Sequence, residues 1–248
     1  MDHGARGGPV ARLAAPLSGV TQTRTGGEWV VEALGAEGVR HVFGIPGIHN
    51  LAIYDALLGQ SAIVHILARH EQGAAFMADG YARSSGCPGV VVVTTGPGAT
   101  NTLTPLVESY SGSIPVLVLM SDIPSALIGA EVGALHEVPN QIHCFKPVCR
   151  WAETIQDGAA IPGAVQGAFH LFRTGRPGPI ALSCPTDLLT AKIDASLTPP
   201  QRGRRPPCDV RLIAEAGQRL ARATRPLIVS GGGAVASEAG SELLAVAQ

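Results

Sequence analysis

Short apolar runs alternate with longer segments of helical periodicity along most of the chain. The runs are rich in β-branched residues, as in GVVVVTT and PVLVLMS. Such runs, alternating with helices, are typical of a parallel sheet that is covered on both faces. We therefore predict a doubly wound parallel α/β sheet. The predicted strands are 39–43, 62–67, 89–95, 115–121 and 179–184, and the predicted helices among them are 50–58, 71–84, 99–110 and 159–174.

A further helix precedes the first predicted strand, and both of its ends carry sequence signals. Thr25 is followed three residues later by Glu28, which is the pattern of a capping box, and Gly38 is expected to end the helix. Asn50 is expected to cap the helix 50–58 in the same way.

The segment 198–207 reads TPPQRGRRPP, with four prolines and three arginines in ten residues, and indicates a linker. We place the linker at 191–208, after a first domain at 25–190. Beyond it, Asp209 is expected to cap a helix 210–222, and a strand 226–230 leads into Gly231–Gly233 and another helix. This is the opening of a second, Rossmann-like domain, incomplete at 209–248 because one strand and two helices cannot close a core.

Composition narrows the class of protein. The chain is 46% hydrophobic, 15% charged and carries a net charge of -1, so neither nucleic acid nor an anionic membrane is expected as partner. No apolar run approaches the ~18 residues needed to span a bilayer, and the five cysteines lack paired spacing. We expect a soluble, cytoplasmic protein with reduced cysteines and no metal site of its own. Residues 1–24 are expected to be a disordered leader, with an organelle transit peptide as the alternative.

Three turns with unusual content follow predicted strands, and open parallel sheets bind ligands at that edge. They are GIPGIHN at 44–50, RHE at 69–71 and TGPGATN at 95–101. Each alone is ambiguous. The third is a phosphate loop or merely a tight turn, and Glu71 is an ordinary acid at a helix N-terminus unless a ligand uses it.

Together, RHEQGAAFMADGYAR, TTGPGATN and SIPVLVLMSD resemble the pyrimidine-binding domain of the acetolactate synthase and 2-oxo acid decarboxylase superfamily over residues 25–190. The resemblance implies thiamine diphosphate as cofactor. It makes Glu71 the catalytic residue, a carboxyl bonded to a pyrimidine nitrogen that favours the imino tautomer of the cofactor. It also implies residues that line the pyrimidine pocket, namely Pro46, Gly47, Thr95, Gly98 and Asn101.

The resemblance further implies a 2-oxo acid substrate and a partner subunit. His136 stands in LHEVPNQ where acetolactate synthases have a glutamine, and would point toward the substrate; a loop histidine bonded to backbone is the alternative. GIPGIHN and LHEVPNQ look more like decarboxylases of longer 2-oxo acids, including guanidino-oxopentanoate decarboxylase. The small residues Ala74, Ala75 and Ala78 permit close packing, which in the family belongs to a dimer interface. The choice between decarboxylation and carbon–carbon bond formation stays open.

In the family a separate domain holds Mg²⁺ and the diphosphate through a Gly-Asp-Gly segment, and none occurs in these 248 residues. We therefore expect Mg²⁺ to bind through a domain absent from this chain, and the isolated chain to bind the cofactor weakly and turn over nothing. A truncated product, a partial sequence and a degenerate paralogue all fit. So does a non-catalytic subunit that pairs with a full-length homologue. The glycines Gly231–Gly233 do not decide whether the second domain binds FAD or no nucleotide, and we favour a domain without a bound nucleotide.

Overall fold

The computed structural model describes residues 21–200 and 207–248. Residues 1–20 of the expected leader and 201–206 of the expected linker therefore lie outside the described residues. Contacts divide the chain into two units, Met1–Arg204 and Arg205–Gln248, and each is described by itself. No helix among the described residues is long and apolar enough to cross a membrane.

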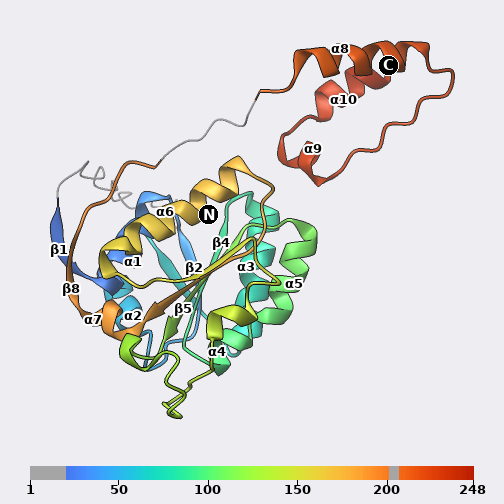
Figure 1. Cartoon of the computed structure of the whole chain (residues 1–248). Coiled ribbons are helices and arrows are strands. Elements are labelled where there is room, and N and C mark those ends of the chain that lie inside the picture. Colours follow the sequence, from blue (N-terminus) through green and yellow to red (C-terminus); the bar gives the residue numbers. More distant parts are fainter. Residues whose placement is uncertain (1–20, 201–206) are drawn as a thin grey trace, which may run out of the picture. The chain divides into compact units, whose positions relative to one another are not determined.

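A six-stranded parallel sheet forms the centre of the first unit (Figure 1). Its order is β3-β2-β4-β5-β7-β6. The strands are β2 (His41–Gly44), β3 (Val64–Leu67), β4 (Gly89–Val93), β5 (Val116–Asp122), β6 (Trp151–Thr154) and β7 (Ile180–Pro185). The predicted doubly wound α/β sheet is confirmed; β6 was not predicted.

Helices cover both faces of the sheet, and β4 shows why its sequence is continuously apolar. Val90 and Val92 belong to the hydrophobic cluster beneath α1 (Gly26–Ala36), α2 (Leu51–Leu58) and α6 (Ile161–Thr174). Val91 and Val93 belong to the opposite cluster, beneath α3 (Glu71–Ser85) and α5 (Leu103–Gly112). Alternate residues of a strand face opposite sides, so a strand covered on both sides carries no polar face.

The alanines of α3 belong to this core. Ala74, Ala75 and Ala78 are fully buried against the chain's own sheet, and a Cβ on Gly89 of β4 would lie 2.1 Å from the carbonyl oxygen of Ala78. The expectation that these alanines contact a partner subunit is therefore wrong. Phe76 and Met77, which lie between Ala75 and Ala78 in the sequence, are exposed on the outer face of α3.

Two end signals read from the sequence have different outcomes. The capping box is confirmed, because Thr25 accepts from Glu28 N while the Glu28 carboxylate accepts from Thr25 N. The expectation that Asn50 caps α2 is wrong, since its side chain makes no capping hydrogen bond. Asn50 instead accepts from the backbone N–H of Gly47 at 2.7 Å and donates to the carbonyl of Ile45 at 3.2 Å.

The predicted helix 99–110 is broken into α4 (Pro97–Thr100) and α5. Pro105 lacks an N–H, so it cannot bond the carbonyl of Asn101 four residues before it. Before this proline, the backbone N–H of Thr102 bonds the carbonyl of Ala99, three residues earlier, so the chain forms a tighter turn here. The break places Asn101 between the two helices, with its side chain available to the neighbouring α3.

Two short strands lie where a leader and a linker are expected. β1 (Gln22–Thr25) pairs antiparallel with β8 (Lys192–Ala195), and the indole of Trp29 donates to the carbonyl of Ile193 at 3.1 Å. A short helix, α7 (Thr186–Thr190), leads from β7 into β8. Ordered structure thus begins earlier than residue 25 and continues past 190.

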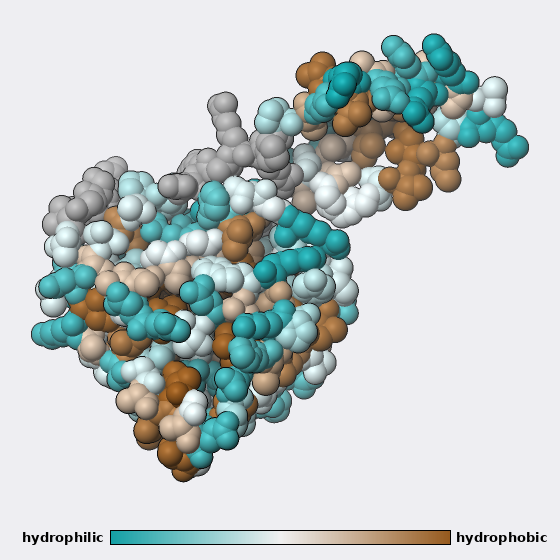
Figure 2. Space-filling model, viewed as in Figure 1, coloured by the Kyte–Doolittle hydropathy of each residue, from teal (hydrophilic) through white to brown (hydrophobic). Residues whose placement is uncertain are grey.

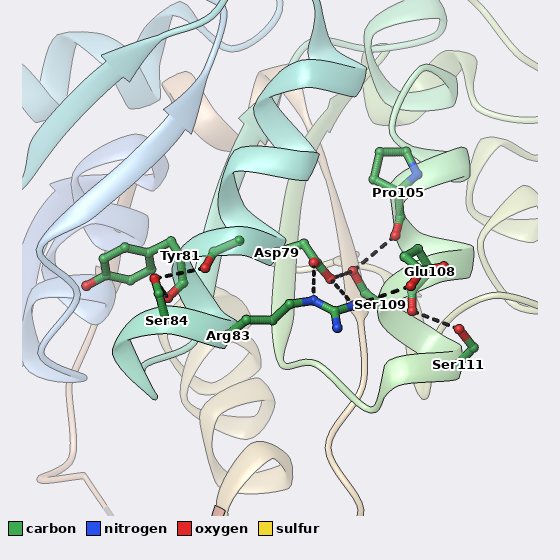
Figure 3. A network of polar contacts seen from close by, with 9 residues as sticks. Asp79, Tyr81, Arg83, Ser84, Pro105, Glu108, Ser109 and Ser111 are labelled. Atoms are coloured by element: carbon green, nitrogen blue, oxygen red, sulfur yellow. Dashed lines mark hydrogen bonds and ion pairs between the residues drawn. The ribbon is translucent and has the colours of Figure 1, made fainter. Parts of the chain in front are cut away.

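A polar network fastens α3 to α5 (Figure 3). The carboxylate of Asp79, buried in α3, accepts from the hydroxyl of Ser109 at 2.7 Å and from Nε of Arg83 at 2.6 Å. Arg83 also reaches Glu108 of α5 at 3.6 Å. The network therefore fixes α3, which begins with Glu71, against α5, which begins shortly after Asn101.

The second unit contains α8 (Val210–Arg222), α9 (Gly232–Ala236) and α10 (Gly240–Ala247). Asp209 caps α8 as predicted, accepting from the N–H groups of Arg211 and Leu212. The predicted strand 226–230 is wrong, because none of its residues is in a strand. A strand needs a neighbour for its hydrogen bonds, and residues 207–248 offer none. Apolar side chains of this unit remain exposed (Figure 2), among them Val210, Leu227 and Val229.

Candidate functional site

Glu71 is the first residue of α3, at the carboxyl edge of the sheet. His70 caps the helix, with Nδ1 accepting from the N–H of Gln72 at 3.1 Å. The half-buried Glu71 accepts a hydrogen bond at Oε2 from Nδ2 of Asn101 at 2.9 Å. Within the described residues no hydrogen bond engages Oε1. One carboxylate oxygen is therefore fixed and the other is open to a ligand.

Gly98 lies directly beside this open oxygen. A Cβ at Gly98 would lie 3.4 Å from Glu71 Oε1 and 2.7 Å from Thr94 Cγ2. The same threonine faces Gly47, where a Cβ would lie 2.7 Å from Thr94 Cβ. Thr94 therefore stands between the two glycine turns that sequence reasoning singled out.

Thr94 is a site residue that the sequence reasoning missed. Its hydroxyl is buried and has no hydrogen-bond partner among the residues that the structure describes. A buried hydroxyl without a partner costs free energy, unless a ligand or water bonds it. Its position directly after the β-branched run of β4, at the carboxyl edge, was the available signal.

The first glycine turn is held from below by Asn50, which bonds both Gly47 and Ile45. Beside it, the hydroxyl of Tyr54 donates to the carbonyl of Val92 at 3.0 Å. Burial, and then the nearby charge of Glu71, raise the pKa of Tyr54, so this phenol stays neutral. Pro46 is exposed and lines a cavity of about 940 Å³ between α2 and β3, which includes none of the other predicted pocket residues.

The side chain of Thr95 has different neighbours from that of Thr94. Its hydroxyl donates to Ser121 Oγ at 3.1 Å. The next residue, Gly96, donates its N–H to Gln141 Oε1 at 2.6 Å and has a φ of 65°. A Cβ at Gly96 would lie 2.1 Å from the carbonyl oxygen of His136. The third turn therefore requires glycine here, and the loop that carries His136 packs directly on it.

His136 lies close to His49, with ring centroids 5.7 Å apart. Both are half-buried, and neither Nδ1 has a hydrogen-bond partner in the described part of the chain. Burial lowers the pKa of His49, the charge of His136 lowers it further, and Asp122 opposes both. The pKa of Asp122 is raised by burial, against the hydrogen bonds from Ser183 and Ile123 N and the charge of His49.

The predicted residues thus fall into three groups. The first group lies around Thr94 and consists of Glu71, Asn101, Gly98 and Gly47. The second consists of Thr95, in the turn 95–101, and His136, which packs on this turn. The third is Pro46, which lines the other cavity. The first group offers an open carboxylate oxygen, a buried hydroxyl and backbone without side chains. Such a surface fits a flat heteroaromatic ring with polar nitrogens, such as the pyrimidine of thiamine diphosphate.

Comparison with known proteins agrees with this geometry. Residues 24–144 match the family described as thiamine pyrophosphate enzyme, N-terminal TPP binding domain. A probable 2-ketoarginine decarboxylase of Pseudomonas aeruginosa is 44% identical over 230 residues, which are 92% of this chain and 40% of the relative.

Two acetolactate synthase large subunits are similar as well. The probable enzyme of Methanocaldococcus jannaschii is 40% identical over 90% of this chain and 38% of its own length. That of Haemophilus influenzae is 37% identical over 90% of this chain and 40% of its own length. The chain spans about two fifths of the length of these curated relatives. Through its residues 24–144 the chain belongs to the thiamine pyrophosphate enzymes, as their N-terminal TPP-binding domain.

Proposed function

We propose that this chain supplies the pyrimidine-binding part of a thiamine diphosphate-dependent enzyme that decarboxylates 2-oxo acids or joins them to a second carbonyl compound. The observation that carries the proposal is the carboxylate of Glu71, with Oε2 fixed by Asn101 and Oε1 open beside Gly98. When bound, thiamine diphosphate supplies an electron sink for the pair released as carbon dioxide leaves a 2-oxo acid.

The chain's own residues bind and orient. Glu71 would hold the pyrimidine through Oε1 and share a proton with one of its nitrogens, while the hydrogen bond from Asn101 keeps the carboxylate from rotating. The missing side chains of Gly47 and Gly98 leave the ring in contact with backbone, and Thr94 offers its buried hydroxyl. Thr95 fixes the turn 95–101 through its hydrogen bond to Ser121.

The substrate is proposed to lie on the side of His136. GIPGIHN and LHEVPNQ, the two segments on which the likeness to decarboxylases of longer 2-oxo acids rests, are brought together by the His49–His136 ring contact. The similarity to the Pseudomonas aeruginosa protein, whose name gives 2-ketoarginine, supports a longer 2-oxo acid.

Mg²⁺ and the diphosphate are proposed to be held by a segment other than these 248 residues, since they contain no Gly-Asp-Gly. The isolated chain should accordingly bind the cofactor weakly and decarboxylate nothing.

The proposed partner is a second copy of the chain or a full-length homologue. The surface suited to it is the outer face of α3 and α5, where Phe76, Met77 and Val107 are exposed. Gly73 and Gly80 lie on the same face of α3, and a Cβ at either would meet nothing within 4 Å, so a neighbouring helix can approach closely. A non-catalytic subunit that pairs through this face is the second candidate function.

Calorimetric titration of the chain with thiamine diphosphate and Mg²⁺ tests the proposal. We expect weak binding that Glu71→Gln reduces at least about tenfold, since a charge-assisted hydrogen bond is lost. Glu32→Gln is the matched control, because the Glu32 side chain is 42% exposed and, among the described residues, forms an ion pair with Arg24 at 3.3 Å. Binding that is insensitive to Glu71→Gln, or decarboxylation by the isolated chain, would contradict it. Co-purification with a full-length homologue, with a change in its rate, would favour the non-catalytic subunit.

A further inference from the structure

A smaller cavity lies between α1, α6 and the segment after β8, lined by none of the residues placed around Glu71. Its volume is about 260 Å³. Its lining residues are Glu37, Gly163, Gln166, Gly167, His170, Arg173, Thr198 and Pro199.

An ion pair between α1 and α6 forms one wall. Nη1 of Arg173, in the last turn of α6, donates to Oε2 of Glu37 at 2.7 Å, at the C-terminal end of α1. The side chain of Glu37 is only 1% exposed. A carboxylate removed from water in this way is stable only when hydrogen bonds satisfy both of its oxygens.

The pair does not satisfy itself. Glu37 Oε1, Arg173 Nε and Arg173 Nη2 are buried and have no hydrogen-bond partner within the described ranges 21–200 and 207–248. Nδ1 of His170, one turn before Arg173, is buried and unpartnered as well. The wall therefore contains two cationic donors and one anionic acceptor that no described residue bonds, and a ligand reaches them only when the wall opens.

The chemistry of these atoms specifies a ligand with both signs of charge. Nε and Nη2 form the edge of a guanidinium that binds a carboxylate through two parallel hydrogen bonds. Glu37 Oε1 needs a donor, and its negative charge disfavours a simple anion, while Arg173 disfavours a simple cation. We propose that this cavity binds a small zwitterion, with its carboxylate on Arg173 and its ammonium group on Glu37.

The remaining walls leave room for such a molecule. A Cβ at Gly163 would meet nothing within 4 Å, and one at Gly167 would lie 3.5 Å from the indole of Trp151. Access depends on the segment at Thr198. Gln166 holds it by donating to the Thr198 carbonyl at 2.6 Å and accepting from its hydroxyl at 3.1 Å. Two side-chain hydrogen bonds are a weak closure, so the wall can open to admit a ligand.

The test titrates the 248-residue chain with glycine, followed by calorimetry and by thermal unfolding. Acetate and methylamine, which carry the two halves of glycine, are run beside it. We expect saturable binding of glycine that is at least about tenfold tighter than that of either half. Saturable stabilisation by acetate equal to that by glycine would overturn the zwitterion, and no saturable glycine binding would overturn the site.

Variants separate binding from folding. Glu37→Gln and Arg173→Lys should each weaken glycine binding at least about tenfold. Both variants should stay folded by circular dichroism. Arg24→Gln, which removes the part-exposed ion pair with Glu32, is the control and should bind glycine as the parent does. Unchanged binding by Glu37→Gln and by Arg173→Lys would show that glycine binds elsewhere.

Discussion

Asn101 donates a hydrogen bond to Glu71 at 2.9 Å across 30 positions of sequence, and so fixes the carboxylate that opens α3. Asn101 lies between α4 and α5 and keeps helical backbone angles, with φ -60° and ψ -19°. Its side chain therefore reaches α3 from a nearly helical turn.

Replacing Asn101 should change ligand binding more than folding. Asn101→Ala removes one partly buried hydrogen bond and should cost about 1 kcal/mol of unfolding free energy. Asn101→Asp places a second carboxylate against Glu71, so it should weaken binding of thiamine diphosphate more than the alanine variant does. Calorimetric titration of both variants checks the order. Equal affinity for the two would mean that the charge of Glu71 is not felt at position 101.

Gly98→Ala should block the site. The new Cβ would stand 2.7 Å from Thr94 Cγ2, so Thr94 must move, and it would contact Glu71 Oε1 at 3.4 Å, on the open side of the carboxylate. We expect a loss of about 1–3 kcal/mol in stability, from overpacking, together with lost cofactor binding. The matched control is Gly80→Ala, where a Cβ meets nothing within 4 Å. It should raise helix stability by up to about 1 kcal/mol. Urea unfolding of both chains distinguishes the two positions, and a Gly98→Ala chain as stable as Gly80→Ala would contradict the prediction.

The central sheet could be predicted because its cause is local. The valines of β4 are buried on both faces, and their sequence says so without reference to any partner. β1 and β8 could not be predicted in this way. QTRT is polar throughout and KIDA is half polar, and their pairing joins Thr23 to Asp194, which no local pattern reports. The apolar residues 226–230 show the converse, since a strand-like sequence forms no strand without a neighbour.

The site residues, too, could be predicted where a sequence motif marks them and not where the fold alone decides. Glu71, Gly98 and Asn101 were predicted from motifs, and the structure brings them together. Thr94 was missed because strand geometry sends adjacent side chains to opposite faces, and sequence alone does not say which of two threonines faces the glycines. Asn50 was predicted to cap a helix and instead holds the turn before it, since its short amide bonds a turn as readily as a helix end.

Asp79 should matter for stability through the α3–α5 contact. Asp79→Ala removes the acceptor for Ser109 and Arg83, and Ser109 is fully buried. We expect a loss of about 1 kcal/mol in unfolding free energy by urea titration, because the buried hydroxyl loses one of two acceptors and keeps the carbonyl of Pro105 at 3.0 Å, while the exposed Arg83 regains water. Glu108→Gln tests the exposed end of the network and should change stability by less than about 0.5 kcal/mol. A loss in Glu108→Gln as large as in Asp79→Ala would place the stabilisation at the surface.

His49 should make the stability of the chain depend on pH. Burial and the charge of His136 lower its pKa below the ordinary value of 6.5, while Asp122 partly offsets them. In the unfolded chain His49 takes up its proton near 6.5, and in the folded chain only at lower pH. The unfolded state therefore binds more protons in this window, and the stability that the neutral ring preserves is lost as the pH falls below 6.5.

His49→Gln should remove this part of the pH dependence. Urea midpoints measured at about pH 7.5 and about pH 5.5 should fall less on acidification in the variant than in the parent. His136→Gln should give an intermediate fall, because one of the two causes that lower the pKa of His49 is gone while its burial remains. A parent and a His49→Gln chain that lose the same stability between the two pH values would show that this ring titrates alike in both states. The order parent, His136→Gln, His49→Gln is therefore the signature of a coupled, partly buried histidine pair at the proposed substrate side of the site.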